Sequence, residues 1–175
     1  MSAERYLVLD GSLGFCIVAI VASDGGEHRL VAEERNHRDP LMRRIAAILP
    51  DEERRLELAG VVVGTGPGSY TSIRVAAAAA AGIAMALHIP VRTSASDRAV
   101  LEAVGRPFSV PLGARESIEV TSSGSDVRPR ERGSLPVDVG ESAETVALSL
   151  VRRSTPETRG IILRYPAPAR GIGDR

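Results

Sequence analysis

The sequence predicts an α/β fold in which strands and helices alternate around a partly parallel sheet. The main observation lies in residues 59–87, where the β-branched run 61–63 leads through a glycine-rich turn into a long alanine-rich helix. A short run that is apolar throughout is typical of a strand buried on both faces. A second apolar segment, 89–93, follows this helix. Because strands joined by a helix are expected to be parallel, the two segments predict a parallel pair.

The first 34 residues predict three antiparallel strands, which are the apolar or alternating segments 6–10, 15–22 and 28–34. A Gly25-Gly26 pair gives a hairpin signal between the last two segments. The turn Asp10-Gly11-Ser12 has two interpretations. It is either a nucleotide-binding turn or a hairpin in which the Asp10 side chain caps its own turn. Leu13 replaces the hydroxyl that would complete a nucleotide-binding turn, which favours the hairpin.

A helix is predicted over residues 39–49. Asp39 is a suitable N-cap, and Pro40 suits the first helical position. The apolar residues of this helix share one stripe, and they are Leu41, Ile45, Ile48 and Leu49. The stretch 51–57 that follows is predicted to be a charged, solvated linker.

A further helix is predicted over residues 97–104, with Ser96 as its N-cap and Gly105 at its end. The order up to residue 105 is therefore β-β-β-α-β-α-β-α, which is that of an actin-like or ribonuclease-H-like lobe. We predict that residues 1–105 form this lobe and that residues 106–175 form a reduced second α/β lobe.

The second lobe is predicted to contain three strands and one amphipathic helix. The strands are placed at 108–112, 117–121 and 160–165, and the helix at 142–153. The stretch 122–136 is rich in Ser, Gly, Arg and Pro, so we expect a mobile loop there.

The glycine-rich turn is a candidate anion site, because a helix N-terminus presents unpaired N–H groups and a partial positive charge. The residues of this candidate phosphate-binding turn are Asp10, Ser12, Gly66, Gly68 and Ser69. Neither a P-loop nor a dinucleotide fingerprint is complete, since the chain has no lysine and Ser69 stands at the third glycine position. The alternative is that the glycines allow tight packing of strand and helix. The order around Ser69 also departs from a nucleophile elbow.

The helix after the turn, 71–87, is predicted to be capped by Ser69 or Thr71. It is apolar all round, so more than one of its sides is expected to be buried. Arg74 is its one charged residue, which we expect to be exposed to solvent or paired with a carboxylate.

Composition makes several functional classes improbable. Formal net charge is zero, which argues against a strongly electrostatic grip on nucleic acid. The single cysteine, Cys16, cannot form an internal disulfide and favours a reducing compartment. We expect no membrane span and no signal peptide, and therefore a cytoplasmic protein. The three histidines lack ligand spacing, so we expect no metal and no cofactor.

The segment 61–87 resembles the signature of the bacterial TsaB family, glycoprotease-like proteins needed to form threonylcarbamoyladenosine in tRNA. That family reads G-x-G-P-G-S-F/Y-T-G-L-R before a helix of small residues. The matching residues are Gly64, Gly66, Pro67, Gly68, Ser69, Tyr70, Thr71 and Arg74. Ser72 and Ile73 depart from the pattern. The resemblance is strong over residues 6–105 and weak thereafter.

The resemblance implies a non-catalytic scaffold that pairs with a TsaD-like catalytic subunit. With a TsaE-like ATPase, the pair would support threonylcarbamoyl transfer to the anticodon-adjacent adenosine of tRNA, which this chain would contact only through the complex. The alanine-faced helix suits close packing, so we expect the interface at Leu41, Ile45, Ala77, Ala80, Ala81 and Ala84. No catalytic residue is expected, and whether the free chain forms a homodimer is left open.

Two alternatives stay open at this stage. The first is an actin-like ATPase that binds nucleotide through the Asp10–Ser12 and glycine-rich turns. The second, suggested by the glycoprotease label of the family, is a peptidase, for which the sequence shows no Ser-His-Asp arrangement.

Overall fold

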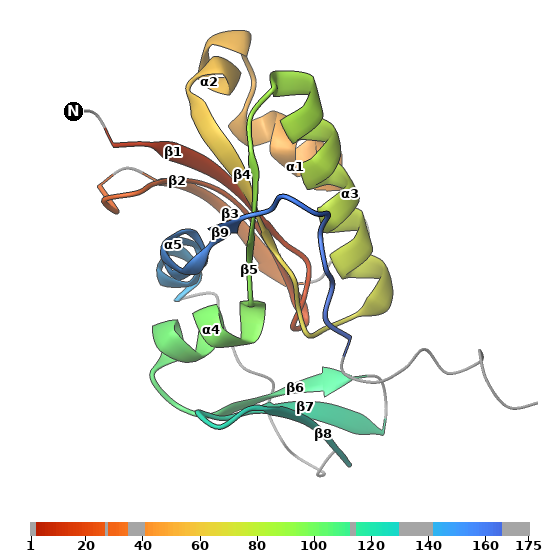
Figure 1. Ribbon diagram of the computed structural model, residues 1–175. Helices are drawn as coiled ribbons and strands as arrows, with labels where there is room; N and C mark the ends of the chain where they lie inside the picture. Colours follow the sequence, from red (N-terminus) through yellow and green to blue (C-terminus); the bar gives the residue numbers. More distant parts are fainter. Residues whose placement is uncertain (1–2, 27, 35–40, 113–114, 130–141, 166–175) are drawn as a thin grey trace, which may run out of the picture.

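The structure is a computed structural model that describes residues 3–26, 28–34, 41–112, 115–129 and 142–165. Its large sheet contains, in spatial order, β3 (His28–Glu34), β2 (Phe15–Ala22), β1 (Arg5–Asp10), β4 (Leu58–Gly64), β5 (Val91–Ser94) and β9 (Thr155–Pro156) (Figure 1). A small antiparallel sheet contains β6 (Phe108–Leu112), β7 (Glu116–Val120) and β8 (Ser125–Pro129). The helices are α1 (Leu41–Ile48), α2 (Glu52–Leu56), α3 (Tyr70–Leu87), α4 (Ser96–Val104) and α5 (Ala143–Arg153).

Strand β1 lies inside the large sheet, and helices cover both of its faces. It pairs antiparallel with β2 and parallel with β4, and β4 pairs parallel with β5 as predicted. Val8 belongs to a hydrophobic cluster that includes residues of α4 and α5, whereas Leu7 and Leu9 belong to a cluster with α1 and α3. Figure 1 shows α1 and α3 on one face of the sheet and α5 on the other. The predicted α/β fold class is confirmed. Each fully buried aliphatic side chain of these clusters contributes about 1.5–3 kcal/mol to the free energy of folding.

The small sheet joins the core through alternate residues of its strands. Phe108 and Val110 of β6 and Ile118 and Val120 of β7 are buried, and all four belong to the cluster on the α4 and α5 side. Their spacing of two residues is the side-chain period of a strand. The two strands predicted in this region are therefore confirmed, with β7 shifted by one residue.

Two stretches predicted to be irregular contain regular elements. The charged linker 51–57 contains the short helix α2, because the Asp51 side chain caps it by accepting the Arg54 N–H at 2.9 Å. Glu52 and Glu53 also suit the positive end of its dipole. The loop predicted over 122–136 contains β8, which pairs with β7. The rest of that loop, from residue 130, lies outside the described residues.

The end of the described chain returns to the large sheet. Helix α5 packs beside α4 and against β2, and the two-residue strand β9 pairs with β5. Residues 160–165 do not form the predicted strand, although they contact both the glycine-rich turn and α3. Whether the chain divides into domains after residue 105 stays a prediction, but α5 and β9 pack with the elements that precede that boundary.

Helix α3 is long and apolar enough to cross a membrane by length and composition alone. This finding differs from the expectation of no membrane span. It is weak evidence, because core helices of soluble proteins meet the same criteria, and one side of α3 packs on the large sheet.

Candidate functional site

The glycine-rich turn and the β1–β2 turn pack directly against each other. A Cβ atom at Gly68 would lie 2.9 Å from the Ser12 Cα and from the Leu13 nitrogen. A Cβ atom at Gly64 would lie 2.3 Å from the Asp10 Cγ. These distances are too short for any side chain, so glycine is required at both positions. Tight packing therefore explains both glycines without a ligand.

Asp10 caps its own turn, as one of the two interpretations predicts. Its Oδ1 accepts the Ser12 N–H at 2.8 Å, and its side chain has no exposed surface. Its Oδ2 has no hydrogen-bond partner within the described part of the chain. Burial raises the pKa of Asp10 above its ordinary value, and the nearby charge of Asp97 acts in the same direction. The folded chain therefore holds the Asp10 proton to a higher pH than the unfolded chain does.

The predicted phosphate-binding residues therefore do not form a site that is open to solvent. Asp10 and Ser12 have no exposed surface, and Gly68 is in contact with Ser12. Gly66 is also covered, because a Cβ atom there would lie 2.6 Å from the carbonyl oxygen of Arg164. Of the five predicted residues, Ser69 retains partial exposure. A phosphate could reach Asp10 and Ser12 only if the two turns separated.

The β1–β2 turn places a leucine in a left-handed conformation. Leu13 and Gly14 have φ of 42° and 84°, and Phe15 donates its N–H to the Ser12 carbonyl at 3.2 Å. Such a conformation costs about 1–2 kcal/mol for a residue other than glycine. Leu13 is 2% exposed and lies in the core, so burial of its side chain, worth about 1.5–3 kcal/mol, offsets this strain.

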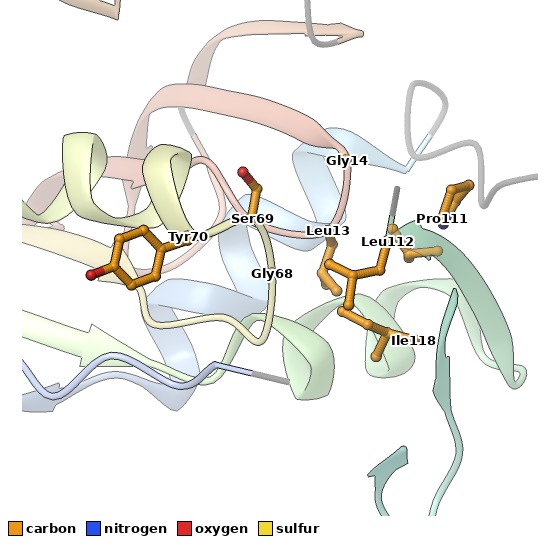
Figure 2. A pocket seen from close by; sticks show the side chains of 9 residues that line it. Leu13, Gly14, Gly68, Ser69, Tyr70, Pro111, Leu112 and Ile118 are labelled. Atoms are coloured by element: carbon orange, nitrogen blue, oxygen red, sulfur yellow. The ribbon is translucent and has the colours of Figure 1, made fainter. Parts of the chain in front are cut away.

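A cavity of about 330 Å³ lies where this turn, the start of α3 and the small sheet meet (Figure 2). Its lining surface is more polar than apolar, and its lining residues are Leu13, Gly14, Gly68, Ser69, Tyr70, Val110, Pro111, Leu112 and Ile118. Ser69 is the N-cap of α3, but its hydroxyl makes no capping bond and instead accepts a long hydrogen bond of 3.4 Å from Ser72. Figure 2 shows this hydroxyl pointing away from Leu112 and Ile118.

The structure buries most of the predicted partner-interface residues and leaves the others partly or fully exposed. Ile45, Ala77, Ala80 and Ala84 are at most 8% exposed and belong to the cluster between α1, α3 and the sheet. Their interpretation as partner contacts is therefore corrected, because they contact other parts of the same chain. Leu41 is partly buried against the same cluster, whereas Ala81 is exposed.

The exposed face of α3 consists mostly of residues that the sequence analysis did not predict as partner contacts, although Ala81 was predicted. Val75 is 49% exposed and Met85 is 77% exposed, and Ala78, Ala81 and Gly82 between them are also exposed. We call these five residues the outer face of α3. Their spacing of three and four residues is a usable signal for a shared helix face. Since alanine occurs on every side of α3, composition alone could not separate this face from the buried one.

Arg74 makes a contact that the sequence did not predict. Its guanidinium carbon lies 3.8 Å from the centre of the Tyr70 ring, and its Nε donates to the Tyr165 hydroxyl at 2.9 Å. The two tyrosine rings lie 4.9 Å apart. Of the two alternatives expected for Arg74, exposure to solvent is confirmed, and its side chain contacts two tyrosines, one of them 91 residues away, in place of a carboxylate.

Near the glycine-rich turn, Asp97 accepts hydrogen bonds from several side chains. Arg164 donates to both of its oxygens, at 2.8 and 3.3 Å, and the Ser125 hydroxyl also donates to it. Ser96, predicted as an N-cap, instead accepts the Gly66 N–H at 3.1 Å, and Ala95 is the N-cap of α4. These bonds join the start of α4 to the glycine-rich turn, to β8 and to residue 164.

Among the residues that the structure describes, no group of three or more His, Cys, Asp and Glu side chains lies close enough to hold a metal ion. Of the histidines, His88 ends α3 in a left-handed conformation, and His37 lies outside the described residues. The expectation that no metal or cofactor binds stays a prediction.

Residues 20–110, a little more than half of the chain, match the family model of TsaD, described as tRNA N6-adenosine threonylcarbamoyltransferase. The chain belongs to this family. It is 35% identical over 105 residues to the uncharacterized protein ML0378 of Mycobacterium leprae. That match covers 57% of this chain and 28% of ML0378, so the chain spans little more than a quarter of this relative.

Two solved structures from Pseudomonas aeruginosa share the fold. One is an uncharacterized protein with similarity to the peptidase YeaZ, at a TM-score of 0.54 and 23% identity, covering 78% of this chain and 72% of that one. The other is YeaZ, at a TM-score of 0.53 and 19% identity, covering 83% of this chain and 90% of that one. The actin-like or ribonuclease-H-like fold is thereby confirmed. Together with the TsaD family match, it supports the predicted resemblance to TsaB, from which this chain is divergent.

Proposed function

We propose that this chain is a non-catalytic scaffold of the machinery that forms threonylcarbamoyladenosine in tRNA, and that it pairs with a TsaD-like catalytic subunit. The observation that carries the proposal is the outer face of α3. It combines two exposed apolar side chains, Val75 and Met85, with small residues that let another helix approach closely. Membership of the TsaD family supports the link to tRNA modification.

Burial in an interface would stabilise a complex through these residues. A fully buried Val or Met side chain contributes about 1.5–3 kcal/mol, and interface cores are enriched in Met and depleted in charged residues. The outer face of α3 fits this description, since residues 75–87 include no charged residue. The TsaD-like partner therefore contacts an apolar helix surface. A TsaE-like ATPase and tRNA bind to the resulting complex, which forms in the cytoplasm.

The test is co-purification of this chain with the TsaD-like protein of the same genome, followed by light scattering and a titration of affinity. Met85→Glu and Val75→Glu place a charge in the proposed interface, so each should weaken pairing at least ten-fold, which corresponds to about 1.4 kcal/mol. Leu56→Glu is the matched control, because Leu56 is a 72% exposed apolar residue on α2. Circular dichroism checks that all three variants are folded.

A complex that forms equally well with Met85→Glu and Val75→Glu would exclude the outer face of α3 as the interface. Two separate species with the wild-type chain, also after addition of the TsaE-like protein, would contradict the scaffold role. The ATPase alternative is then tested by calorimetry with ATP and Mg²⁺. Heat of binding that disappears in Ser69→Ala would favour it. The covered positions of Asp10 and Ser12 argue against it.

A further inference from the structure

We propose that Arg74 is a positioning residue that clamps residues 161–165 onto the start of α3, and that the partner meets α3 and this segment together. We call residues 161–165 the strap. The first part of the proposal stands on the contacts of this chain. The second part rests on the proposed function, because it concerns the surface offered to the TsaD-like subunit.

The clamp consists of three side chains. Tyr70 and Arg74 lie four residues apart on α3, so they share one side of the helix. Tyr70 offers its ring face to the Arg74 guanidinium at 3.8 Å, and Tyr165 of the strap accepts the Arg74 Nε–H at 2.9 Å. The guanidinium carbon also lies 5.9 Å from the centre of the Tyr165 ring. Arg74 thus joins Tyr165 of the strap to the first turn of α3.

At residue 164 the strap is held by different groups. The Arg164 N–H donates to the Thr65 carbonyl at 2.8 Å, and the Arg164 guanidinium donates to both oxygens of the buried Asp97. The strap backbone lies so close to the glycine-rich turn that a Cβ atom at Gly66 would lie 2.6 Å from the Arg164 oxygen. These contacts fix the strap over the turn, and the Arg74 contact fixes its last described residue beside the first turn of α3.

The strap also contributes to the surface next to α3. Ile161 and Leu163 pack against the cluster beneath α3, whereas Ile162 between them is 75% exposed. Figure 1 shows this segment running alongside α3. If the strap were released, Ile161 and Leu163 would leave the cluster and uncover the flank of α3. A partner that fits α3 together with Ile162 would then lose part of its surface.

The role of Arg74 is tested first without any partner, by hydrogen exchange of the free chain. Arg74→Gln removes the charge and the ring contact, so the amide of Arg164 should exchange about 5- to 30-fold faster, as expected for the loss of one cation–π contact and one hydrogen bond. Tyr165→Phe removes only the acceptor and should give a smaller increase. Arg159→Gln, which removes an exposed arginine that is no part of the clamp, should leave this exchange unchanged.

The second measurement is the affinity of the same variants for the TsaD-like subunit. We expect affinity to fall in the order in which exchange rises, with Arg74→Gln the weakest, and Arg74→Lys to recover part of both signals. Lost affinity with unchanged exchange would mean that Arg74 touches the partner directly, and unchanged exchange in Arg74→Gln would mean that it does not hold the strap. Either result overturns the proposal. If the wild-type chain does not pair at all, the proposed function fails, while exchange in the free chain still decides whether Arg74 is a clamp.

Discussion

The two faces of α3 have similar compositions but opposite surroundings. The inner face contains Ala76, Ala77, Ala80 and Ala84, which pack against β4 and α1, and the outer face contains Ala78, Ala81 and Gly82 between two exposed apolar residues. Small residues on the inner face bring the helix close to the sheet. Small residues on the outer face are packed against nothing comparable within the described chain, which is why we assign that face to a partner. Whether a stripe of alanines packs in the core or is available to a partner therefore depends on which elements lie against it.

The difference in burial between the two faces is tested most directly by placing the same bulky side chain on each face. Ala80 has no exposed surface, so Ala80→Leu would overpack the core and should lower the free energy of unfolding by about 1–3 kcal/mol. Ala81 is exposed, so Ala81→Leu should change it by less than about 0.5 kcal/mol. Urea denaturation of both variants measures the difference. Equal destabilisation would mean that the outer face is covered within this chain, and the partner assignment would lose its basis.

The buried carboxyl group of Asp10, at the end of β1, gives a second prediction, which concerns pH. Because burial raises the pKa of Asp10 above its ordinary value of 3.8, the folded chain holds this proton where the unfolded chain loses it. The stabilising contribution of Asp10 is therefore complete below pH 3.8 and is lost as pH rises through the raised pKa. The slope is at most about 1.4 kcal/mol per pH unit for one proton. Asp10→Asn cannot titrate, so its curve of stability against pH should lack this decline.

Asp97→Asn is a second variant for the pH experiment, because it removes a nearby charge that raises the pKa of Asp10. Asp97 is also buried, but it is bonded to Arg164 and Ser125, so its removal tests the loss of a paired carboxylate. If the wild-type and Asp10→Asn chains have parallel stability curves between pH 4 and pH 8, Asp10 is ionised in the folded state and the space around it is more open than the structure shows.

Much of the fold follows from the sequence, because local signals and tertiary environment agree there. Strands β2, β3 and β6 have the predicted bounds, and Gly105 ends α4 in the left-handed conformation expected of a terminal glycine. Helix α2 and strand β8 were missed because charged and small polar residues give no apolar period. Their formation depends on the Asp51 cap and on pairing with β7.

The candidate site was less predictable for a physical reason. Glycine at positions 64 and 68 is equally consistent with a nearby phosphate and with a nearby backbone, and a sequence cannot distinguish the two. The structure favours packing within the chain, because the Asp10 carboxyl group lies against Gly64 and the Ser12 backbone lies against Gly68. The contact between Arg74 and Tyr165 has no local signal at all, since the two residues are 91 positions apart.

The smallest predicted effect concerns the two ends of the outer side of α3. The first turn of α3 contains no acidic residue and its N-cap makes no side-chain capping bond, so a carboxylate there would meet the positive end of the helix dipole. Thr71→Glu should stabilise the chain by about 0.3–1 kcal/mol at low ionic strength. Ala86→Glu places the same charge in the last turn and should destabilise it by a similar amount. Both residues are exposed, so packing changes little in either variant.

Salt separates this electrostatic effect from any other. Because the dipole interaction is screened, both shifts should shrink toward zero when thermal unfolding is repeated near 1 M salt, where the Debye length is about 3 Å. Shifts of equal sign in the two variants, or shifts that persist in high salt, would mean that the ends of α3 are not open to solvent. The outer side of α3 would then resemble its inner side at the termini, and the free surface available to a partner would be confined to the middle of the helix.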